Sequence, residues 1–307
     1  MKYYFAPLEG LTDSVYRRLH HKYFPGIDLY FTPFLSPTVH RQLSAREARE
    51  LPPVDTVDFS VVPQILTKSS DDFVWLAQQC HARGYQQVNL NLGCPSGTVT
   101  AKGKGSAMLA DLDALDTFLY EIFARTSIKI SVKTRIGFHS AEEFPVILAV
   151  LNRYPICELT VHPRVRSAFY NGEVDMQAFS YAAENTKIPL CYNGDIRCGQ
   201  DAHAIGQRFP NVNIMAGRGL IANPGMFCPN KTTAEKLQNF HDELLEEYLH
   251  LFGGSRNAMF RLKEHWFYLK DKFEGSEKLA KQLRKTTDLA QYRAITHEIF
   301  RTLPYIP

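Results

Sequence analysis

Residues able to bind a ligand or transfer a proton recur along the first two-thirds of the chain, each close after a short apolar run. They comprise side-chain amides, cations, a thiol, an imidazole and two glycine-containing turns: Gln64, Asn89, Asn91, Cys94, Lys133, Arg135, His162, Arg164, Asn193–Asp195 and Gly217–Gly219. Any one of them alone is better explained structurally, because Asn commonly forms turns and free Cys is commonly buried. Five successive runs that end in such groups indicate a shared polar ligand, since each buried polar group without a partner would cost about 1–3 kcal/mol.

The elements that would position these residues are eight apolar, strand-like runs that alternate with helical patterns. The runs cover residues 3–8, 27–32, 61–66, 86–92, 128–135, 157–163, 188–196 and 212–219. Several are apolar on both faces, as strands buried on both sides are. Eight strand–helix units in about 220 residues are typical of a (β/α)8 TIM barrel, in which the carboxyl ends of all strands meet at one mouth. An open doubly wound sheet would also fit the alternation, but the first strand lacks the G-x-G-x-x-G turn of a dinucleotide-binding sheet.

The turns predicted after the last two strands are suited to phosphate. Barrels often bind phosphate at this position through backbone N–H groups and a helix N-terminus. Asn193-Gly194 and the Gly217–Gly219 turn supply glycines for close approach, and Arg218 supplies a planar cation. Lys133 would then be free to neutralise another part of the ligand.

The composition changes after residue 230. A capping box at Thr232–Glu235 predicts a helix with apolar residues at three- and four-residue spacing, and Gly253-Gly254 ends it. Further helical patterns follow to the end of the chain. We therefore predict an α/β chain with two domains, a catalytic TIM barrel over residues 1–230 and a small all-helical domain over residues 231–307.

Bulk composition excludes several classes of protein. The 307 residues are 45% hydrophobic and 22% charged, with a net charge of +3, so an RNA-binding patch would have to be local. The six cysteines show no C-x-x-C spacing, which predicts neither a zinc site nor a redox dithiol. No apolar run approaches the roughly 18 residues of a membrane span, and the first residues lack a signal-peptide core. We expect a cytoplasmic monomer with no metal and no membrane contact.

The chain resembles the tRNA-dihydrouridine synthase family across the whole predicted barrel. The resemblance is carried in order by APLEGLTD (6–13), PQIL (63–66), NLNLGCP (89–95), G-x-G (103–105), KTR (133–135), HPR (162–164), NGDI (193–196) and GRGLIANP (217–224). The Asn-x-Gly-Cys-Pro element is the most diagnostic of these motifs. The helical tail is similar to the RNA-binding domain that follows the barrel in this family.

The resemblance implies FMN in the barrel mouth, NADPH (with NADH as an alternative) as electron donor, and tRNA as substrate. By motif, the residues implied in flavin binding are Pro7, Leu8, Glu9, Gln64, Lys133, His162, Asn193, Gly194, Asp195, Gly217 and Arg218. The last five would hold the phosphate. Asn91 and Arg135 resemble residues that face the target base, and Arg164 is a further candidate. Leu8 stands where many members have Met, and its similar volume predicts little change.

The implied reaction saturates the C5–C6 bond of uracil. Hydride from a reduced flavin would reach C6, and Cys94 would act as the general acid toward C5, because a thiol with a pKa of about 8.5 is protonated at neutral pH. The target base would have to be flipped out of the folded tRNA. Basic residues on the predicted helices of the tail could grip that RNA: Arg256, Arg261, Lys263, Lys270, Lys272, Lys278, Lys281, Arg284 and Lys285. Such charges more commonly form a solvated helix face, and residues 231–307 carry thirteen basic against eleven acidic residues.

Three alternatives fit part of the pattern. An FMN-dependent barrel reductase of a free pyrimidine or an enone would share the phosphate site and Lys133, but it would not need the helical tail. A non-catalytic RNA-binding protein could use a degenerate barrel, although the intact set of Cys94, Lys133 and His162 argues against decay. A phosphosugar lyase or aldolase could form a Schiff base at Lys133.

Overall fold

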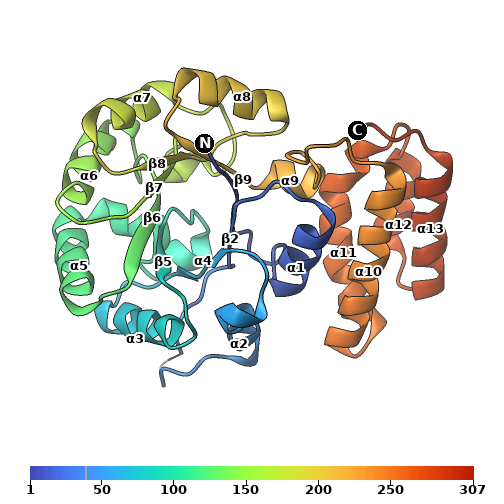
Figure 1. Cartoon of the computed structure of the whole chain (residues 1–307), viewed down its shortest axis with the longest axis horizontal. Helices are drawn as coiled ribbons and strands as arrows, with labels where there is room; N and C mark the ends of the chain where they lie inside the picture. The colour runs from blue at the N-terminus through green and yellow to red at the C-terminus, as the bar shows by residue number, and fades with distance from the viewer. Residues whose placement is uncertain (39) are drawn as a thin grey trace.

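The fold is a closed barrel of parallel strands with a group of four helices beside it (Figure 1). It is seen in a computed structural model that describes residues 1–38 and 40–307. The strands are β1 (Tyr3–Phe5), β2 (Leu29–Phe31), β3 (Val61–Val62), β4 (Gln64–Ile65), β5 (Gln87–Leu92), β6 (Lys129–Arg135), β7 (Leu159–His162), β8 (Leu190–Tyr192) and β9 (Asn213–Ala216). All eight predicted strands are therefore present, each inside the predicted range.

Pro63 explains why nine strand segments make an eight-stranded barrel. The sheet runs in the order β3-β2-β1-β9-β8-β7-β6-β5-β4, so its two outer members are β3 and β4. These two are consecutive pieces of one strand, interrupted at Pro63, which has no N–H to donate to a ladder. Its carbonyl oxygen still accepts a hydrogen bond from the N–H of Asn89 at 2.8 Å. The sheet thus closes on itself, which confirms the predicted TIM barrel.

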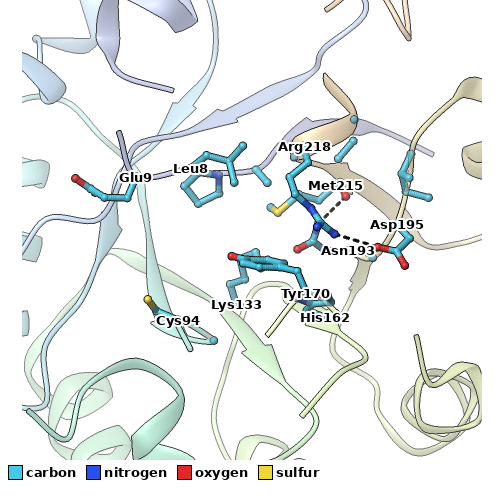
Figure 2. A pocket seen from close by; sticks show the side chains of 18 of the residues that line it. Leu8, Glu9, Cys94, Lys133, His162, Tyr170, Asn193, Asp195, Met215 and Arg218 are labelled. Atoms are coloured by element: carbon cyan, nitrogen blue, oxygen red, sulfur yellow. Dashed lines mark hydrogen bonds and ion pairs between the residues drawn. The ribbon is translucent and has the colours of Figure 1, made fainter. Parts of the chain in front are cut away.

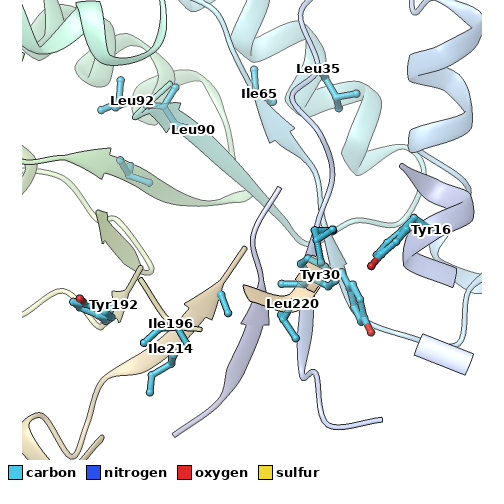
Figure 3. Packing of buried hydrophobic residues seen from close by; sticks show 14 of the residues in the cluster. Tyr16, Tyr30, Leu35, Ile65, Leu90, Leu92, Tyr192, Ile196, Ile214 and Leu220 are labelled. Atoms are coloured by element: carbon cyan, nitrogen blue, oxygen red, sulfur yellow. The ribbon is translucent and has the colours of Figure 1, made fainter. Parts of the chain in front are cut away.

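Strand alternation sorts the side chains into an outer apolar layer and an inner column that becomes polar toward the mouth. On β5, the alternate residues Val88, Leu90 and Leu92 join the large hydrophobic cluster between strands and helices (Figure 3). Asn89 and Asn91 occupy the other positions and therefore face the barrel interior. In the ladder Asn91 lies opposite Lys133, and Arg135 lies opposite His162. The period of two thus places the predicted polar residues on one inner surface.

Five of the helices around the barrel begin at a side-chain cap, which is supplied by Asp13, Ser44, Ser69, Asp111 or Asp175. They are α1 (Ser14–Tyr23), α2 (Ala45–Glu50), α3 (Ser70–His81), α4 (Gly97–Thr100), α5 (Leu112–Arg125), α6 (Phe144–Leu151), α7 (Met176–Asn185), α8 (Gly199–Arg208) and α9 (Arg218–Ala222). A capping box forms at Ser140, with the Glu143 side chain accepting from the Ser140 backbone N–H. Short 3-10 turns at Gly105–Ala110 and Arg166–Ala168 shape the loops after β5 and β7.

The last four helices are α10 (Ala234–Phe252), α11 (Ser255–Leu269), α12 (Glu277–Lys285) and α13 (Leu289–Thr302). Gly253 ends α10 in a left-handed cap with φ 63°, as its sequence predicts. The predicted capping box at Thr232 is wrong by one residue: the side chain of Thr233 caps the helix by accepting from the N–H of Lys236. The hydroxyl of Thr232 instead lies beside Gly225.

The four helices share a hydrophobic core with the barrel. Phe240 of α10 packs edge-on against Tyr16 of α1, with ring centroids 5.5 Å apart. The ring of His265 on α11 stacks on the same Tyr16 ring, with centroids 4.7 Å apart. Because one cluster of buried residues continues from the barrel into α10–α13, the two parts are packed together rather than joined by a linker alone.

Candidate active site

A cavity of about 500 Å³ opens at the carboxyl ends of the strands (Figure 2). It contains all but one of the site residues predicted from the sequence: Pro7, Leu8, Glu9, Gln64, Asn91, Cys94, Lys133, Arg135, His162, Asn193, Gly194, Asp195, Gly217 and Arg218. The exception is Arg164. A barrel mouth lined by residues of five strands and by the loops that follow the others is suited to hold a ligand larger than a single metabolite ring.

Asn91 fixes the backbone that presents Cys94. Its side-chain oxygen accepts hydrogen bonds from the N–H groups of Gly93 at 3.0 Å and Cys94 at 2.9 Å. Because both partners are donors, the amide nitrogen must point the other way, where it donates to Gln64 at 2.7 Å. Asn91, which the sequence predicts to face the target base, thus uses most of its hydrogen-bonding groups to bind the cysteine loop and Gln64.

A second loop wraps around the other side of Cys94. The hydroxyl of Ser106 donates to the Cys94 carbonyl at 2.8 Å. Gly105 has φ 62°, and a Cβ at that position would lie 3.0 Å from the same carbonyl oxygen, so glycine is required there. Burial raises the pKa of the Cys94 thiol above its ordinary value, against smaller opposing effects from a backbone hydrogen bond at Ser96 and from Lys133. The thiol is therefore held in place and protonated at neutral pH.

Lys133 places a cation at the inner end of the cavity. Burial, followed by the positive charge of Arg135, lowers its pKa to about 8. Within residues 1–38 and 40–307, its Nζ atom forms no hydrogen bond or ion pair. A cation without a partner at this depth is costly unless an electron-rich ligand group lies against it.

His162 is a neutral imidazole whose tautomer is set by its neighbour. Burial, followed by the charges of Lys133 and Arg135, lowers its pKa well below the ordinary value. The Nη1 atom of Arg164, which can only donate, lies 3.1 Å from the His162 Nε2 atom. Nε2 must therefore accept, and the ring proton resides on Nδ1, where it can serve as a hydrogen-bond donor.

The turns after β8 and β9 are in direct contact. A Cβ on Gly219 would lie 2.1 Å from the Ile196 carbonyl oxygen, so only glycine permits this approach. Arg218 donates from Nη2 to the Asp195 carboxylate at 3.2 Å, while its guanidinium remains partly exposed to the cavity. Asn193 donates to the Met215 carbonyl at 2.8 Å and so ties the turn after β8 to strand β9. Glycines, a fixed Arg and neighbouring backbone N–H groups together form a site suited to an anion.

The side chains of Arg164 and Asp195 pair with each other, which the sequence did not predict. The Arg164 side chain is 1% exposed, and it forms an ion pair with Asp195 and donates to the carbonyls of Asn171 at 3.2 Å and Gly172 at 2.5 Å. The Asp195 carboxylate therefore orients two arginines, Arg164 and Arg218, and an anionic ligand would meet its backbone rather than its side chain.

Arg135 likewise binds protein carbonyls. Its Nε donates to Gly93 at 3.0 Å, its Nη1 to Val165 at 2.8 Å and its Nη2 to Phe169 at 2.5 Å. The guanidinium thus joins the loop of the cysteine to the segment 165–172. That segment carries Tyr170, which lines the cavity and lies beside His162 and below Arg218 in Figure 2.

Tyr170 is the cavity residue that sequence reasoning missed most clearly. Its ring stacks against His162 with centroids 6.1 Å apart, and the Arg218 guanidinium lies 4.7 Å from its centroid. Nothing in the spacing of apolar runs marks an aromatic residue in an irregular loop. Tyr268 and Asp271, from the end of α11 and the turn after it, also line the cavity, so the helical part completes its wall.

Two further observations concern the residues that the structure describes. Over residues 1–38 and 40–307 there is no group of three or more His, Cys, Asp or Glu side chains placed to bind a metal ion. Over the same ranges, no helix combines the length and the apolar character required to cross a bilayer.

The chain matches known proteins over most of its length. The family model described as dihydrouridine synthase (Dus) matches residues 4–302. The probable tRNA-dihydrouridine synthase 1 of Synechocystis sp. is 28% identical over 97% of this chain and 86% of its own length. The tRNA-dihydrouridine synthase B of Pasteurella multocida is 27% identical over 76% of this chain and 70% of its own length.

Solved structures share the barrel at much lower identity. A variant of NCR from Zymomonas mobilis superimposes with a TM-score of 0.51 at 12% identity, over 73% of this chain and 83% of that one. Morphinone reductase in complex with tetrahydroNAD gives a TM-score of 0.50 at 10% identity, over 73% and 85%. These likenesses concern the fold alone.

Proposed function

We infer, from the premise that this chain belongs to the dihydrouridine synthase family, that it reduces the C5–C6 double bond of uridines in tRNA by means of a bound flavin. Relatives that cover most of the chain carry the name tRNA-dihydrouridine synthase, which supports tRNA as the substrate. The observation that carries the proposal is that the Cys94 thiol and the Lys133 ammonium line one cavity together with the touching turns of β8 and β9. We propose residues 1–230 as the catalytic domain, residues 231–307 as the RNA-binding domain, and a cytoplasmic monomer as the active form.

FMN is the flavin that we propose, because the cavity offers an anion site at the turns after β8 and β9 and a half-buried cation on β6. Arg218, Gly217 and the turn at Asn193–Asp195 would hold the phosphate, as predicted from the sequence. Lys133, which has no partner in the described chain, would lie against an electron-rich part of the ring system. Pro7, Leu8, Glu9 and Gln64 would complete the wall around the ring, and His162 would donate to it from Nδ1.

When bound and reduced, the flavin supplies a hydride to C6 of the uracil, with NADPH as the proposed electron donor. The chain itself must deliver a proton to C5. Cys94 is placed for this step, because Asn91 and Ser106 fix its backbone and burial keeps the thiol protonated. Lys133 would stabilise negative charge that develops on the ligand. Asn91 and Arg135 hold the cysteine loop in position, and the second amide hydrogen of Asn91 remains available to the base.

The experiment that tests this proposal compares substrates with one flavin-loaded protein preparation. Transfer RNA from a strain that lacks this protein should be reduced at defined uridines with consumption of NADPH, whereas free uracil, free uridine and a small enone should not. Equal turnover of free uracil would favour a free-pyrimidine reductase instead. A protein without flavin absorbance after reconstitution, or one in which borohydride traps a carbonyl substrate on Lys133, would contradict the proposal.

A further inference from the structure

Two phenylalanines project from the outer face of α11. Phe260 is 68% exposed and Phe267 is 65% exposed, although both belong to a helix whose opposite face is fully buried. A separation of seven residues places them on the same face, about 10 Å apart along the axis. Single exposed apolar residues are ordinary, but two large rings repeated on one helix face leave an apolar surface that a partner could cover.

Basic residues alternate with the two rings along this face. Arg256, Lys263 and Lys270 lie three or four residues before or after Phe260 and Phe267, so the five side chains form one stripe. We call it the α11 stripe. Two of these cations have partners within the chain: Lys263 donates to the Thr286 carbonyl, and Lys270 pairs with Asp271 at 2.5 Å. Glu264 and Asp271 are the acidic residues of the same segment. The segment 255–272 still carries five basic residues and two acidic ones.

The charge of the helical part is segregated toward the α11 stripe. Helix α10 contains five acidic residues and a single lysine, and two of its glutamates are turned toward the barrel, where Glu243 pairs with Lys22 and Glu247 with Arg18. Helix α12, which follows the stripe, again carries four basic residues against one acidic residue. The nearly neutral net charge over residues 231–307 therefore combines an acidic α10 with basic segments at α11 and α12.

The α11 stripe begins at the rim of the active-site cavity. The Phe267 ring lies edge-on to Tyr268, with centroids 5.0 Å apart, and Tyr268 lines the cavity together with Asp271. In Figure 1, α11 lies on the barrel side of the helical part, next to α9. A chain that leaves the cavity in this direction would therefore meet Phe267 first and Phe260 about two helical turns later.

We propose that Phe260 and Phe267 stack on unpaired bases of the tRNA that flank the target uridine, while Arg256, Lys263 and Lys270 contact the adjoining phosphates. Exposed aromatic rings interleaved with cations are the means by which proteins hold single-stranded nucleic acid, because every base has a face that can stack. This inference rests on the proposed function. It adds a specific stacking surface that prepares the loop of the substrate for extraction of one base.

The test measures tRNA affinity of the flavin-loaded protein by fluorescence anisotropy at several salt concentrations. Phe260→Ala and Phe267→Ala should each weaken binding about tenfold without changing the slope of log K against log salt, because no phosphate contact is lost. Lys270→Ala should instead reduce that slope by about one. Phe267→Trp should preserve affinity, and Phe267→Leu should not, since leucine keeps the apolar surface but cannot stack.

Tyr120 supplies the matched control. It is 68% exposed, as Phe260 is, but it lies on α5, at the edge of the barrel away from the helical part (Figure 1). Tyr120→Ala should bind tRNA as the unaltered protein does. The double variant of Phe260 and Phe267 should raise KM for tRNA and leave NADPH oxidation by the flavin in the absence of tRNA unchanged, which separates a binding surface from a damaged active site.

Several results would overturn the inference. Binding within twofold of the unaltered protein by the double alanine variant would do so, as would full affinity in Phe267→Leu. If Phe260→Asp changes the sedimentation of the protein but not its tRNA affinity, the α11 stripe is a contact between two copies of the chain. If the unaltered protein neither binds nor reduces tRNA, the proposed function fails as well, and this outcome differs from loss of the stacking effect alone.

Discussion

Arg135 donates a hydrogen bond of 2.5 Å to the carbonyl oxygen of Phe169, a bulky residue whose backbone has φ 49°. Such a conformation costs on the order of 1–3 kcal/mol and persists where its surroundings impose it. The same guanidinium reaches Gly93 beside the candidate acid. The Arg135 side chain therefore holds the cysteine loop and the segment 165–172 in fixed positions relative to each other. Part of the free energy of its hydrogen bonds offsets the backbone strain at Phe169.

This relationship predicts that Arg135→Met loosens the segment 165–172. Hydrogen exchange in that segment should rise, and kcat/KM for tRNA should fall by about 10- to 100-fold, because three hydrogen bonds from a charged donor are lost. Adding Phe169→Gly, which removes the strain, should restore part of the stability. Unaltered exchange in Arg135→Met would mean that the guanidinium does not hold the segment.

Replacement of Lys133 by Met should stabilise the flavin-free protein and weaken flavin binding. The pKa of Lys133 is about 8, whereas an unfolded chain has an ordinary value of about 10.4, so folding disfavours the charged form. The expected gain at neutral pH is on the order of 1–3 kcal/mol, together with flavin affinity at least tenfold lower. Chemical denaturation and flavin titration measure the two effects separately.

The pH dependence of the free energy of unfolding follows from the lowered pKa of Lys133. Between about pH 8 and pH 10 the unfolded chain binds a proton at this lysine that the folded protein has released, so the free energy of unfolding should rise with pH in that window. Lys133→Met should lack this increment, and the comparison of the two proteins isolates it from other titrating groups. A rise of equal size in both proteins would assign it elsewhere.

Much of the site could be predicted from the sequence because barrel geometry converts sequence order into position. Once the apolar runs identify strands, their carboxyl ends must meet at one mouth, and a period of two sends Asn91 and Lys133 to the same inner surface. The same logic brought the turns at Asn193 and Gly217 together. No contact between individual side chains had to be foreseen for this result.

The sequence could not predict how the cations are partnered. Arg135 and Arg164 were expected to face substrate, but both are directed at carbonyl oxygens of the segment 165–172. That segment has no periodic pattern, and its path depends on hydrogen bonds from Arg164 and from Arg135, which lies at least 30 positions earlier than its partners in the segment. Tyr170 was missed for the same reason. Thr233 rather than Thr232 caps α10 because threonine is suitable at either position and tertiary packing decides between them.

Cys94→Ala should retain the flavin spectrum and lose nearly all reduction of tRNA, at least 100-fold in a single turnover. Cys94→Ser is the matched variant, because a hydroxyl of similar size is a far weaker acid. In the unaltered protein burial raises the thiol pKa, so the rate should stay level through neutral pH and fall only above about pH 8.5. A decline between about pH 6.5 and 7.5 that disappears in Cys94→Ala would contradict a protonated thiol as the acid.

Asp195→Asn should impair stability and flavin binding together, because this carboxylate serves two arginines in different environments. Arg164 is 1% exposed at its side chain, and removal of its counter-charge leaves a buried cation, which predicts a loss of about 2–4 kcal/mol in the free energy of unfolding. Arg218 is 38% exposed and would lose its orientation toward the cavity. Flavin affinity should fall about tenfold in consequence.

The second arginine allows the two effects of Asp195→Asn to be separated. Arg218→Gln should reproduce the loss of flavin affinity while leaving stability close to that of the unaltered protein, since its guanidinium is partly solvated.

Although burial alone would raise the pKa of Asp195, Arg164 and Arg218 hold it below its ordinary value. The pair therefore contributes stability at pH values above about 3.9, and this contribution is lost as pH falls through the lower pKa of the folded state. Acid denaturation of Asp195→Asn should lack that component, whereas Arg218→Gln should keep most of it because Arg164 remains. If both variants lost stability equally, Arg218 rather than Arg164 would be the partner on which the fold depends.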